Sequence, residues 1–248
     1  REEVVETHDD TVITRNSYGA LCLNTPDVLF ADVDFESRGV TRWHITAFAL
    51  LETAAILISF RFHSLGMLLL LTVAAFALTP GLSGTLARVL PDNPQEKAMK
   101  RIRAFVESHP QWRLRVYRTP AGMRLLAMHR TFSTEDPEVH ELFAQLGCDP
   151  MYVYMCRNQR CFRARITPKP WRVGVSRHIV PRRGVWPVDP EMLPAREEWV
   201  REYENSCRSY AACRFLEELG EGHIDRKAET VRKIHDDACR AASDFPIA

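Results

Sequence analysis

Two long apolar stretches interrupt an otherwise polar chain. Residues 45–60 carry one charged side chain, Glu52, and residues 62–87 carry no Asp, Glu, Lys or Arg. A helix of about 20 apolar residues crosses a hydrocarbon core of about 30 Å, so the second stretch is long enough by itself. The pattern predicts a transmembrane helical hairpin over residues 40–90, with its turn near Arg61.

A pair of buried core helices, or an interfacial element, is the alternative interpretation. Glu52 favours it, because an ionised group at the centre of a bilayer costs at least about 2.5 kcal/mol. The four consecutive leucines at 68–71 favour the membrane. Basic residues are more frequent in the flanks than in the turn, which predicts a bacterial inner membrane with the soluble part in the cytoplasm. These flanking residues are Arg38, Arg42, Arg88, Lys97, Lys100, Arg101 and Arg103.

With the hairpin set aside, the remaining pattern alternates between strand and helix periods. Strands are predicted at 28–35, 112–118, 123–129 and 160–167, and helices at 95–108 and 136–145. The order βαββαβ is that of a ferredoxin-like or RRM-like palm. We therefore predict an α+β fold with a palm-like domain formed by residues 1–39 and 91–188, and a further hairpin over 3–14.

The chain beyond Pro190 has a helical pattern. Residues 197–219 and 226–242 are predicted as two helices separated by Gly220-Glu221-Gly222. Cys213 falls in the packing stripe of the first helix. Residues 189–248 are accordingly predicted to be a C-terminal helical extension.

The net charge of +1 conceals a separation of charge along the sequence. Residues 1–36 hold nine acids, whereas residues 150–188 hold nine Lys or Arg, including Arg183, and no acid. Aromatic residues are interspersed in the basic segment, a combination typical of sites for nucleotides or single-stranded nucleic acid. Two other interpretations remain open: contact with anionic lipid, or pairing with the acidic segments of the same chain.

Two carboxylates stand at the end of the first predicted strand, in the sequence VLFADVDFE. Residues i and i+2 of a strand face the same side, so Asp32 and Asp34 are expected about 7 Å apart. Carboxylates with substrate phosphates are the usual ligands of Mg²⁺, and Mn²⁺ suits similar oxygen ligands. These two acids are therefore candidate metal ligands and catalytic residues. A solvated strand end is the alternative interpretation.

The stretch from Val116 to Leu126, VYRTPAGMRLL, resembles the second motif of bifunctional primase–polymerase domains in the archaeo-eukaryotic primase superfamily. In that family a strand ending in h-h-D-x-D precedes a helix and then a strand–turn–strand with T-P-S-G-G-x-H. The first motif matches at Asp32 and Asp34, and the turn matches at Thr119, Pro120 and Gly122. The segment CFRARITPKPWRVG at 161–174 is similar to uncharacterised bacterial proteins.

The resemblance implies that the acids bind Mg²⁺ or Mn²⁺ and that the turn containing Thr119 and Gly122 binds phosphates. Basic side chains would then neutralise the bound charge, and the candidates are Arg124, Arg163 and Arg165. The chain also departs from the family pattern. The second glycine of the motif falls at Met123 and its histidine at Leu125, while His129 lies four residues further on.

The seven cysteines are expected to be reduced thiols. Cys148, Cys156 and Cys161 lie near two histidines, but their spacing fits a zinc site poorly, and buried free thiols are the alternative. His235-Asp236-Asp237 is expected on an exposed helical segment and resembles half of a metal motif. No partner histidine stands at a supporting spacing.

Two hypotheses for the function follow. One is a membrane-anchored, non-catalytic palm-like module that binds a nucleotide, nucleic acid or protein partner. The other is a divalent-metal-dependent nucleotidyltransferase acting on nucleotides. The arrangement of Asp32, Asp34 and Arg163 distinguishes them, because a metal enzyme requires both acids to be open to one pocket.

Overall fold

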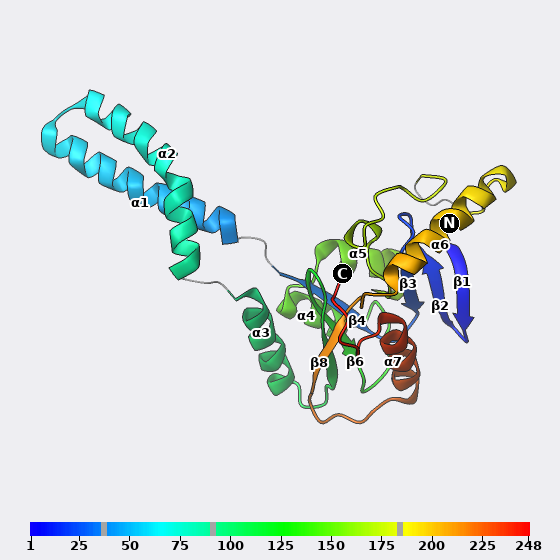
Figure 1. The fold of residues 1–248 in the computed structure, drawn as a ribbon. Coiled ribbons are helices and arrows are strands. Elements are labelled where there is room, and N and C mark those ends of the chain that lie inside the picture. Colours follow the sequence, from blue (N-terminus) through cyan, green and yellow to red (C-terminus); the bar gives the residue numbers. More distant parts are fainter. Residues whose placement is uncertain (36–38, 90–92, 183–185) are drawn as a thin grey trace. The chain divides into compact units, whose positions relative to one another are not determined.

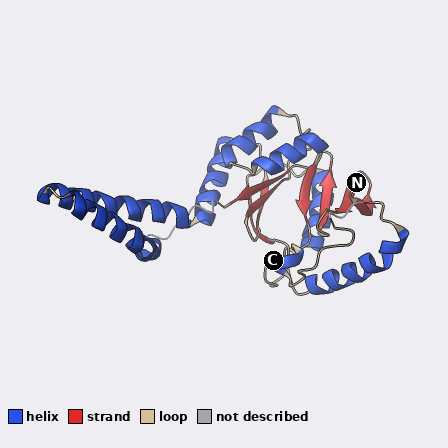
Figure 2. Ribbon diagram, turned by 90° about the horizontal axis from the view of Figure 1, so that it is seen from above, coloured by secondary structure: helices blue, strands red, loops and turns tan. Residues whose placement is uncertain are grey.

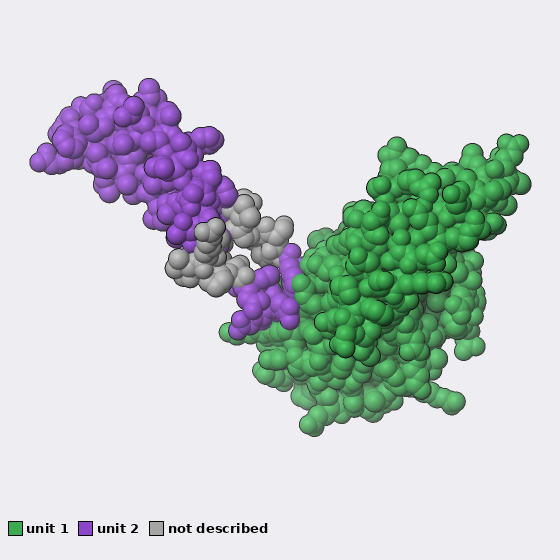
Figure 3. Space-filling view, in the orientation of Figure 1, with its two compact units in different colours: residues 1–34, 98–248 green, residues 35–97 purple. Residues whose placement is uncertain are grey.

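The computed structural model describes residues 1–35, 39–89, 93–182 and 186–248, and the chain divides into two compact units (Figures 1 and 3). Unit 1 comprises residues 1–34 and 98–248, and unit 2 comprises residues 35–97. Arg38 of the basic flank and Arg183 of the basic segment lie outside the described residues.

Unit 2 contains the predicted helical hairpin. Helices α1 (Gly39–Phe62) and α2 (Leu65–Val89) lie side by side (Figure 1). Residues 43–62 and 65–86 are long and apolar enough to cross a membrane, and only 17% and 11% of these stretches are buried. Glu52 has a partner across the hairpin, since Thr72 Oγ1 donates a hydrogen bond to Glu52 Oε1 at 2.8 Å. The two helices are thus confirmed, and their position in a bilayer stays a prediction.

Unit 1 is built on two antiparallel sheets, with strands at its centre and helices around them (Figure 2). The first sheet has the order β1 (Glu3–His8), β2 (Thr11–Arg15), β3 (Leu21–Thr25) and β7 (Phe162–Arg165). The second has the order β4 (Phe30–Asp34), β6 (Gly122–Ala127), β5 (Leu114–Arg118) and β8 (Arg214–Leu219). The helices are α3 (Pro94–Ser108), α4 (Pro137–Leu146), α5 (Pro150–Gln159), α6 (Leu193–Cys207) and α7 (Arg226–Cys239), with short 3₁₀ turns η1 (Pro170–Arg172) and η2 (Pro190–Met192).

The predicted α+β class is confirmed, but the predicted single four-stranded sheet is not observed. Strands β4, β5 and β6 share one sheet, whereas β7 pairs with β3 in the other. Strand β3 was not predicted from the sequence. A four-residue strand takes its partner from whichever sheet edge is available, and that choice depends on distant parts of the chain.

The predicted helix over 197–219 is wrong in its second half. Helix α6 ends at Cys207, and β8 extends the second sheet by pairing with β5. Glu218 accepts hydrogen bonds from Arg113 and Arg115, and Glu217 accepts one from Arg103 at 2.8 Å. Two glutamates favour a helix in isolation. Here, pairing with β5 and its neighbouring arginines outweighs that preference.

Helix α5 was not predicted, and it lies along the edge of β4. Its first turn has Asp149 as N-cap, which accepts a hydrogen bond from Met151 N at 3.0 Å, and Pro150 follows at N1. The main-chain nitrogen of Asp149 donates to Asp32 O at 3.1 Å, and Tyr152 Oη donates to Phe30 O at 2.8 Å. These two bonds satisfy main-chain oxygens of the edge strand β4. Those oxygens therefore do not need β7 as a neighbouring strand.

Candidate functional site

A cavity of about 340 Å³ lies in unit 1 where residues of both sheets meet. Six of the seven predicted site residues line it: Asp32, Asp34, Thr119, Arg124, Arg163 and Arg165. The seventh, Gly122, is not among its lining residues. The alternation within β7 places Arg163 and Arg165 on one face, between the buried Phe162 and Ala164.

Asp32 is paired with Arg124, which stands directly opposite it on β6. Arg124 Nε donates to Asp32 Oδ1 at 2.8 Å, and Nη2 donates to Oδ2 at 3.2 Å. The remaining nitrogen, Nη1, donates to the main-chain oxygen of Arg165 at 2.7 Å. Burial lowers the pKa of Arg124, but the charge and hydrogen bonds of Asp32 outweigh burial and raise it, so the guanidinium stays charged. Both carboxylate oxygens of Asp32 are thereby engaged within the sheet.

Asp34 differs from Asp32 because it has no ion pair among the described residues. It lies at the exposed end of β4 and faces the same side as Asp32. Burial raises the pKa of the Asp34 carboxyl, and the nearby Asp32 and Asp149 carboxylates raise it further. Lys169 and Arg165 oppose this shift. Ionised Asp34 is therefore destabilised in the unliganded protein.

Asp34→Asn is expected to stabilise the unliganded protein at neutral pH. The folded-state pKa of Asp34 lies above its unfolded value, so its ionisation removes stability as the pH rises through the folded pKa. The unfolding temperature of the variant should exceed that of wild type at pH 8. The difference should fade below about pH 4, where the folded and the unfolded state both hold the proton. Asp237→Asn, on the exposed face of α7, is the matched control. A loss of stability in Asp34→Asn at pH 8 would contradict this expectation.

A third carboxylate, Asp149, also lines the cavity. One of its oxygens caps helix α5. The three acids do not form a compact metal cage. Across the described residues, the only group of three His, Cys, Asp or Glu with all ligand atoms within 4.8 Å of one another lies elsewhere. Any divalent ion here would need ligand-supplied oxygens, in the way that Mg²⁺ is often held by substrate phosphates.

The turn between β5 and β6 is closed by its own hydrogen bonds. Thr119 N donates to Gly122 O at 2.9 Å, and Gly122 N donates to Thr119 Oγ1 at 3.0 Å. The amide of Gly122 is therefore occupied within the turn. Glycine is required here for close packing, because a Cβ at Gly122 would lie 2.1 Å from Val33 O. Thr119 lines the cavity, and Gly122 holds the turn against β4.

The basic side chains that line the cavity, together with the neighbouring Arg172, divide into paired and unpaired groups. Arg163 is neutralised by Glu2, with Nη2 at 2.7 Å from both carboxylate oxygens. Arg165, Lys169 and Arg172 have no carboxylate within ion-pair distance among the described residues. Burial and the charges of Arg165 and Arg172 lower the pKa of Lys169, and burial and Arg165 lower the pKa of Arg172, while Asp34 opposes both shifts. Nη1 of Arg172 is buried without a hydrogen-bond partner.

Two aromatic rings lie beside this unpaired group. Tyr18 lines the cavity and packs against Trp171, with ring centroids 5.3 Å apart. Arg165 Nη1 donates to Tyr18 Oη at 3.4 Å, and Lys169 Nζ lies 5.4 Å from the centre of the Trp171 ring. Trp171 is 57% exposed, which is high for so large an apolar side chain. The site thus combines unpaired cations with an accessible ring.

Several cavity residues were not singled out from sequence. Asp149 was overlooked because helix α5 was not predicted, although D-P is a recognisable helix start. Tyr18 is brought to the cavity by the unpredicted β3. His129, considered above for its proximity to the motif, packs instead against Trp112 and Phe132, and burial lowers its pKa to about 4. Comparison of the chain with family models, curated proteins and solved structures finds no match.

Proposed function

We propose that the chain is a membrane-anchored module whose unit 1 binds a nucleotide in the cavity without catalysing a reaction on it. The observation that carries the proposal is the group Arg165, Lys169 and Arg172, which repel one another. Asp34 attracts these cations, but among the described residues no carboxylate lies within ion-pair distance of them. Like charges gathered in a partly buried place favour a multivalent anion, and phosphates are the anions that Arg and Lys commonly bind in proteins.

The aromatic pair supports a nucleotide rather than a bare phosphate. Base stacking on an aromatic ring contributes about 1–3 kcal/mol, and Tyr18 and Trp171 lie next to the cations. The cavity of about 340 Å³ is at the small end of ligand sites. This size suits a mononucleotide, or one nucleotide of a single strand.

The pairing of Asp32 supports a binding role over catalysis. A two-metal mechanism needs carboxylates that are free to bridge two ions, and both oxygens of Asp32 are already bonded to Arg124. A fixed guanidinium beside the carboxylate also repels a divalent cation.

Anchoring by α1 and α2 is the second part of the proposal. Their low burial within unit 2 and their apolar length support insertion in a bilayer. The basic residues that follow the hairpin, Lys97, Lys100, Arg101 and Arg103, support an orientation with unit 1 on the cytoplasmic side of the membrane.

Thermal unfolding of the full chain in detergent tests the binding proposal. A ligand at 100 times its dissociation constant adds about 2.7 kcal/mol to the stability of the folded state, so ATP or GTP should raise the unfolding temperature without a metal. The shift should be lost in Arg165→Gln/Lys169→Gln and kept in Lys100→Gln/Arg157→Gln, which removes two exposed charges outside the cavity. Inorganic pyrophosphate, as a further probe, separates phosphate binding from base stacking. Equal shifts in both double variants would contradict the proposal.

Metal-dependent nucleotidyl transfer is a second candidate, because Asp34 has no ion pair within the described part of the chain and Asp149 supplies a further acid to the cavity. The resemblance to primase–polymerase domains suggests the same chemistry. This candidate predicts that Mn²⁺ and a nucleoside triphosphate stabilise the folded protein only when both are present. Asp34→Asn should abolish that stabilisation, and the wild-type protein should release pyrophosphate. A shift independent of Mn²⁺ and retained in Asp34→Asn would exclude it.

A further inference from the structure

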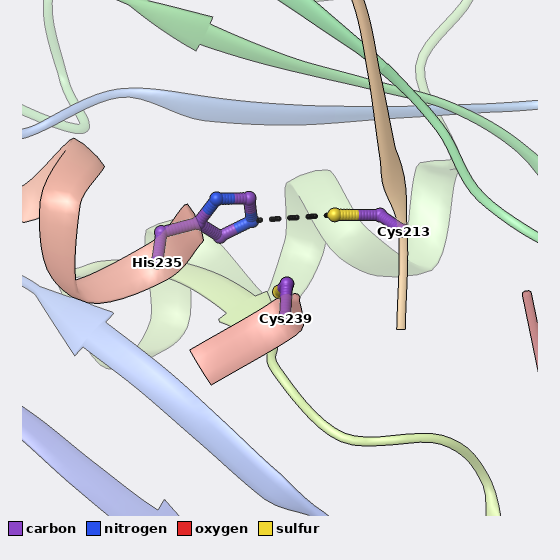
Figure 4. A group of neighbouring side chains, drawn as sticks. All are labelled: Cys213, His235 and Cys239. Carbon is purple, nitrogen blue, oxygen red and sulfur yellow. Dashed lines mark hydrogen bonds between the residues drawn. The ribbon is translucent and has the colours of Figure 1, made fainter. Parts of the chain in front are cut away.

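A second group of reactive side chains lies in unit 1, and none of its members lines the cavity. Cys213 immediately precedes β8, and His235 and Cys239 lie one turn apart on α7 (Figure 4). Their ligand atoms all lie within 4.8 Å of one another, and the three residues are at most 1% exposed. The fold thus brings Cys213 to the same buried place as His235, which is 22 positions later in the sequence.

The imidazole of His235 is fixed with one nitrogen toward the cysteines. Nδ1 lies 3.0 Å from Asp236 Oδ1, and Nε2 lies 3.9 Å from Cys213 Sγ. A carboxylate at Nδ1 holds the proton on that nitrogen, so the lone pair of Nε2 faces the sulfurs. Figure 4 shows the ring and the Cys213 side chain pointing toward each other.

Asp236 is itself held firmly. Tyr117 Oη donates to Asp236 Oδ1 at 2.7 Å, and Arg115 and Arg232 donate to Oδ2 at 3.1 and 3.0 Å. A histidine that binds a metal almost always donates its other ring nitrogen to a carboxylate or carbonyl, which orients the ring. Asp236 meets that requirement, with partners from β5 and α7.

We propose that Cys213, His235 and Cys239 bind one Zn²⁺ ion. Two thiolates and one imidazole are ligands that zinc prefers. Sulfur and nitrogen atoms bound at about 2.3 Å and 2.0 Å to a tetrahedral ion lie about 3.5 Å apart. The 3.9 Å between Cys213 Sγ and His235 Nε2 therefore needs to close by only a few tenths of an ångström.

The charges around the group are compatible with the ion. Two thiolates balance the charge of Zn²⁺, so the occupied site is neutral beside the Asp32–Arg124 pair, which is itself neutral. The main-chain oxygen of Arg165, 3.9 Å from Cys239 Sγ, or a water would complete the coordination.

The role that follows is structural. Zinc would join the start of β8 to α7 and so fix the C-terminal segment on the second sheet. A site of this kind contributes directly to folding free energy. The half-motif at His235 would be completed by Cys239, one turn later on α7, and by Cys213, which is distant in sequence. The predicted exposure is wrong at His235, which is fully buried.

The metal content of the full chain, purified in detergent from zinc-supplemented cells, is the first measurement. About one zinc ion per chain is expected by mass spectrometry of the metal, and replacement by Co²⁺ should give a thiolate-to-cobalt charge-transfer band together with visible d–d bands of tetrahedral cobalt. Wild-type protein with neither zinc nor these cobalt bands would overturn the proposal. In that case the three residues form a packed thiol–imidazole cluster or a Cys213–Cys239 disulfide.

Variants locate the ion. Cys213→Ser and Cys239→Ser should each lose the cobalt bands, whereas Cys161→Ser and Cys207→Ser, which alter cysteines outside the group, should keep them. Asp236→Asn tests the positioning role of the carboxylate and should weaken zinc affinity about 10- to 100-fold. Cobalt bands that survive in both Cys213→Ser and Cys239→Ser would place the metal elsewhere. The wild-type measurement decides the matter if these variants fail to fold.

Discussion

Asp32→Asn is expected to lower the free energy of unfolding by about 3–5 kcal/mol, the cost of breaking a buried ion pair from one side. Arg124 is only 3% exposed and makes two of its hydrogen bonds to Asp32. Without the carboxylate, a guanidinium that cannot lose its proton stays buried without a counter-charge. Urea unfolding of the full chain in detergent, followed by tryptophan fluorescence, measures the loss.

A second substitution separates the pair from other effects of the asparagine. Arg124→Met in the Asp32→Asn background removes the stranded charge, so the double variant should be more stable than Asp32→Asn alone. Glu217→Gln is the exposed control, since its pair with Arg103 should contribute only about 0–1 kcal/mol. If the free energy of unfolding of Asp32→Asn lies within about 1 kcal/mol of the wild-type value, the ion pair with Arg124 does not fix Asp32. The acid would then be free to bind metal.

Gly122→Ala is expected to lower the free energy of unfolding by about 3 kcal/mol, at the upper end of the cost of overpacking. The added Cβ would lie 2.1 Å from Val33 O and 2.8 Å from Asp34 Cα. Both are main-chain atoms, so β4 has to move away from β6, because no side chain can rotate to make room. Thermal unfolding of the full chain measures the loss.

The same substitution also tests how the cavity is shaped. Residues of β4 form part of the cavity wall, so a displaced β4 changes the shape of the site, and ATP should stabilise Gly122→Ala less than wild type. Gly84→Ala on α2, where nothing lies within 4 Å of the added carbon, is the control and should keep full stability. A stable Gly122→Ala protein with unchanged ATP binding would show that the two strands are not packed this closely.

Local periodicity was sufficient for much of the fold. Alternation along β4 and β7 correctly placed Asp32 with Asp34 and Arg163 with Arg165, and helical spacing identified α3. These features depend only on residues two to four positions apart. The α1–α2 hairpin was readable for the same reason, since a continuous apolar run needs no knowledge of its partners.

Features that depend on distant partners could not be predicted. The sequence around Glu217 and Glu218 holds no signal for a strand. Their partners are three arginines more than 100 positions earlier, and these contacts accompany the pairing of this segment with the sheet. The pairing of Asp32 with Arg124 spans 92 residues, and from the sequence both looked equally available to a ligand. The group of Cys213, His235 and Cys239 is likewise assembled by the meeting of β8 and α7.

The insertion of the hairpin between β4 and its sheet partner sets an order for synthesis. Strand β4 leaves the ribosome before α1 and α2, and β6 follows only after both helices. Domains commonly fold as they are synthesised, but β4 must wait unpaired while the apolar helices emerge. If these helices enter a bilayer as they are made, insertion precedes closure of the second sheet. A delay in insertion would leave an unpaired strand edge next to two exposed apolar helices, the combination most prone to aggregation.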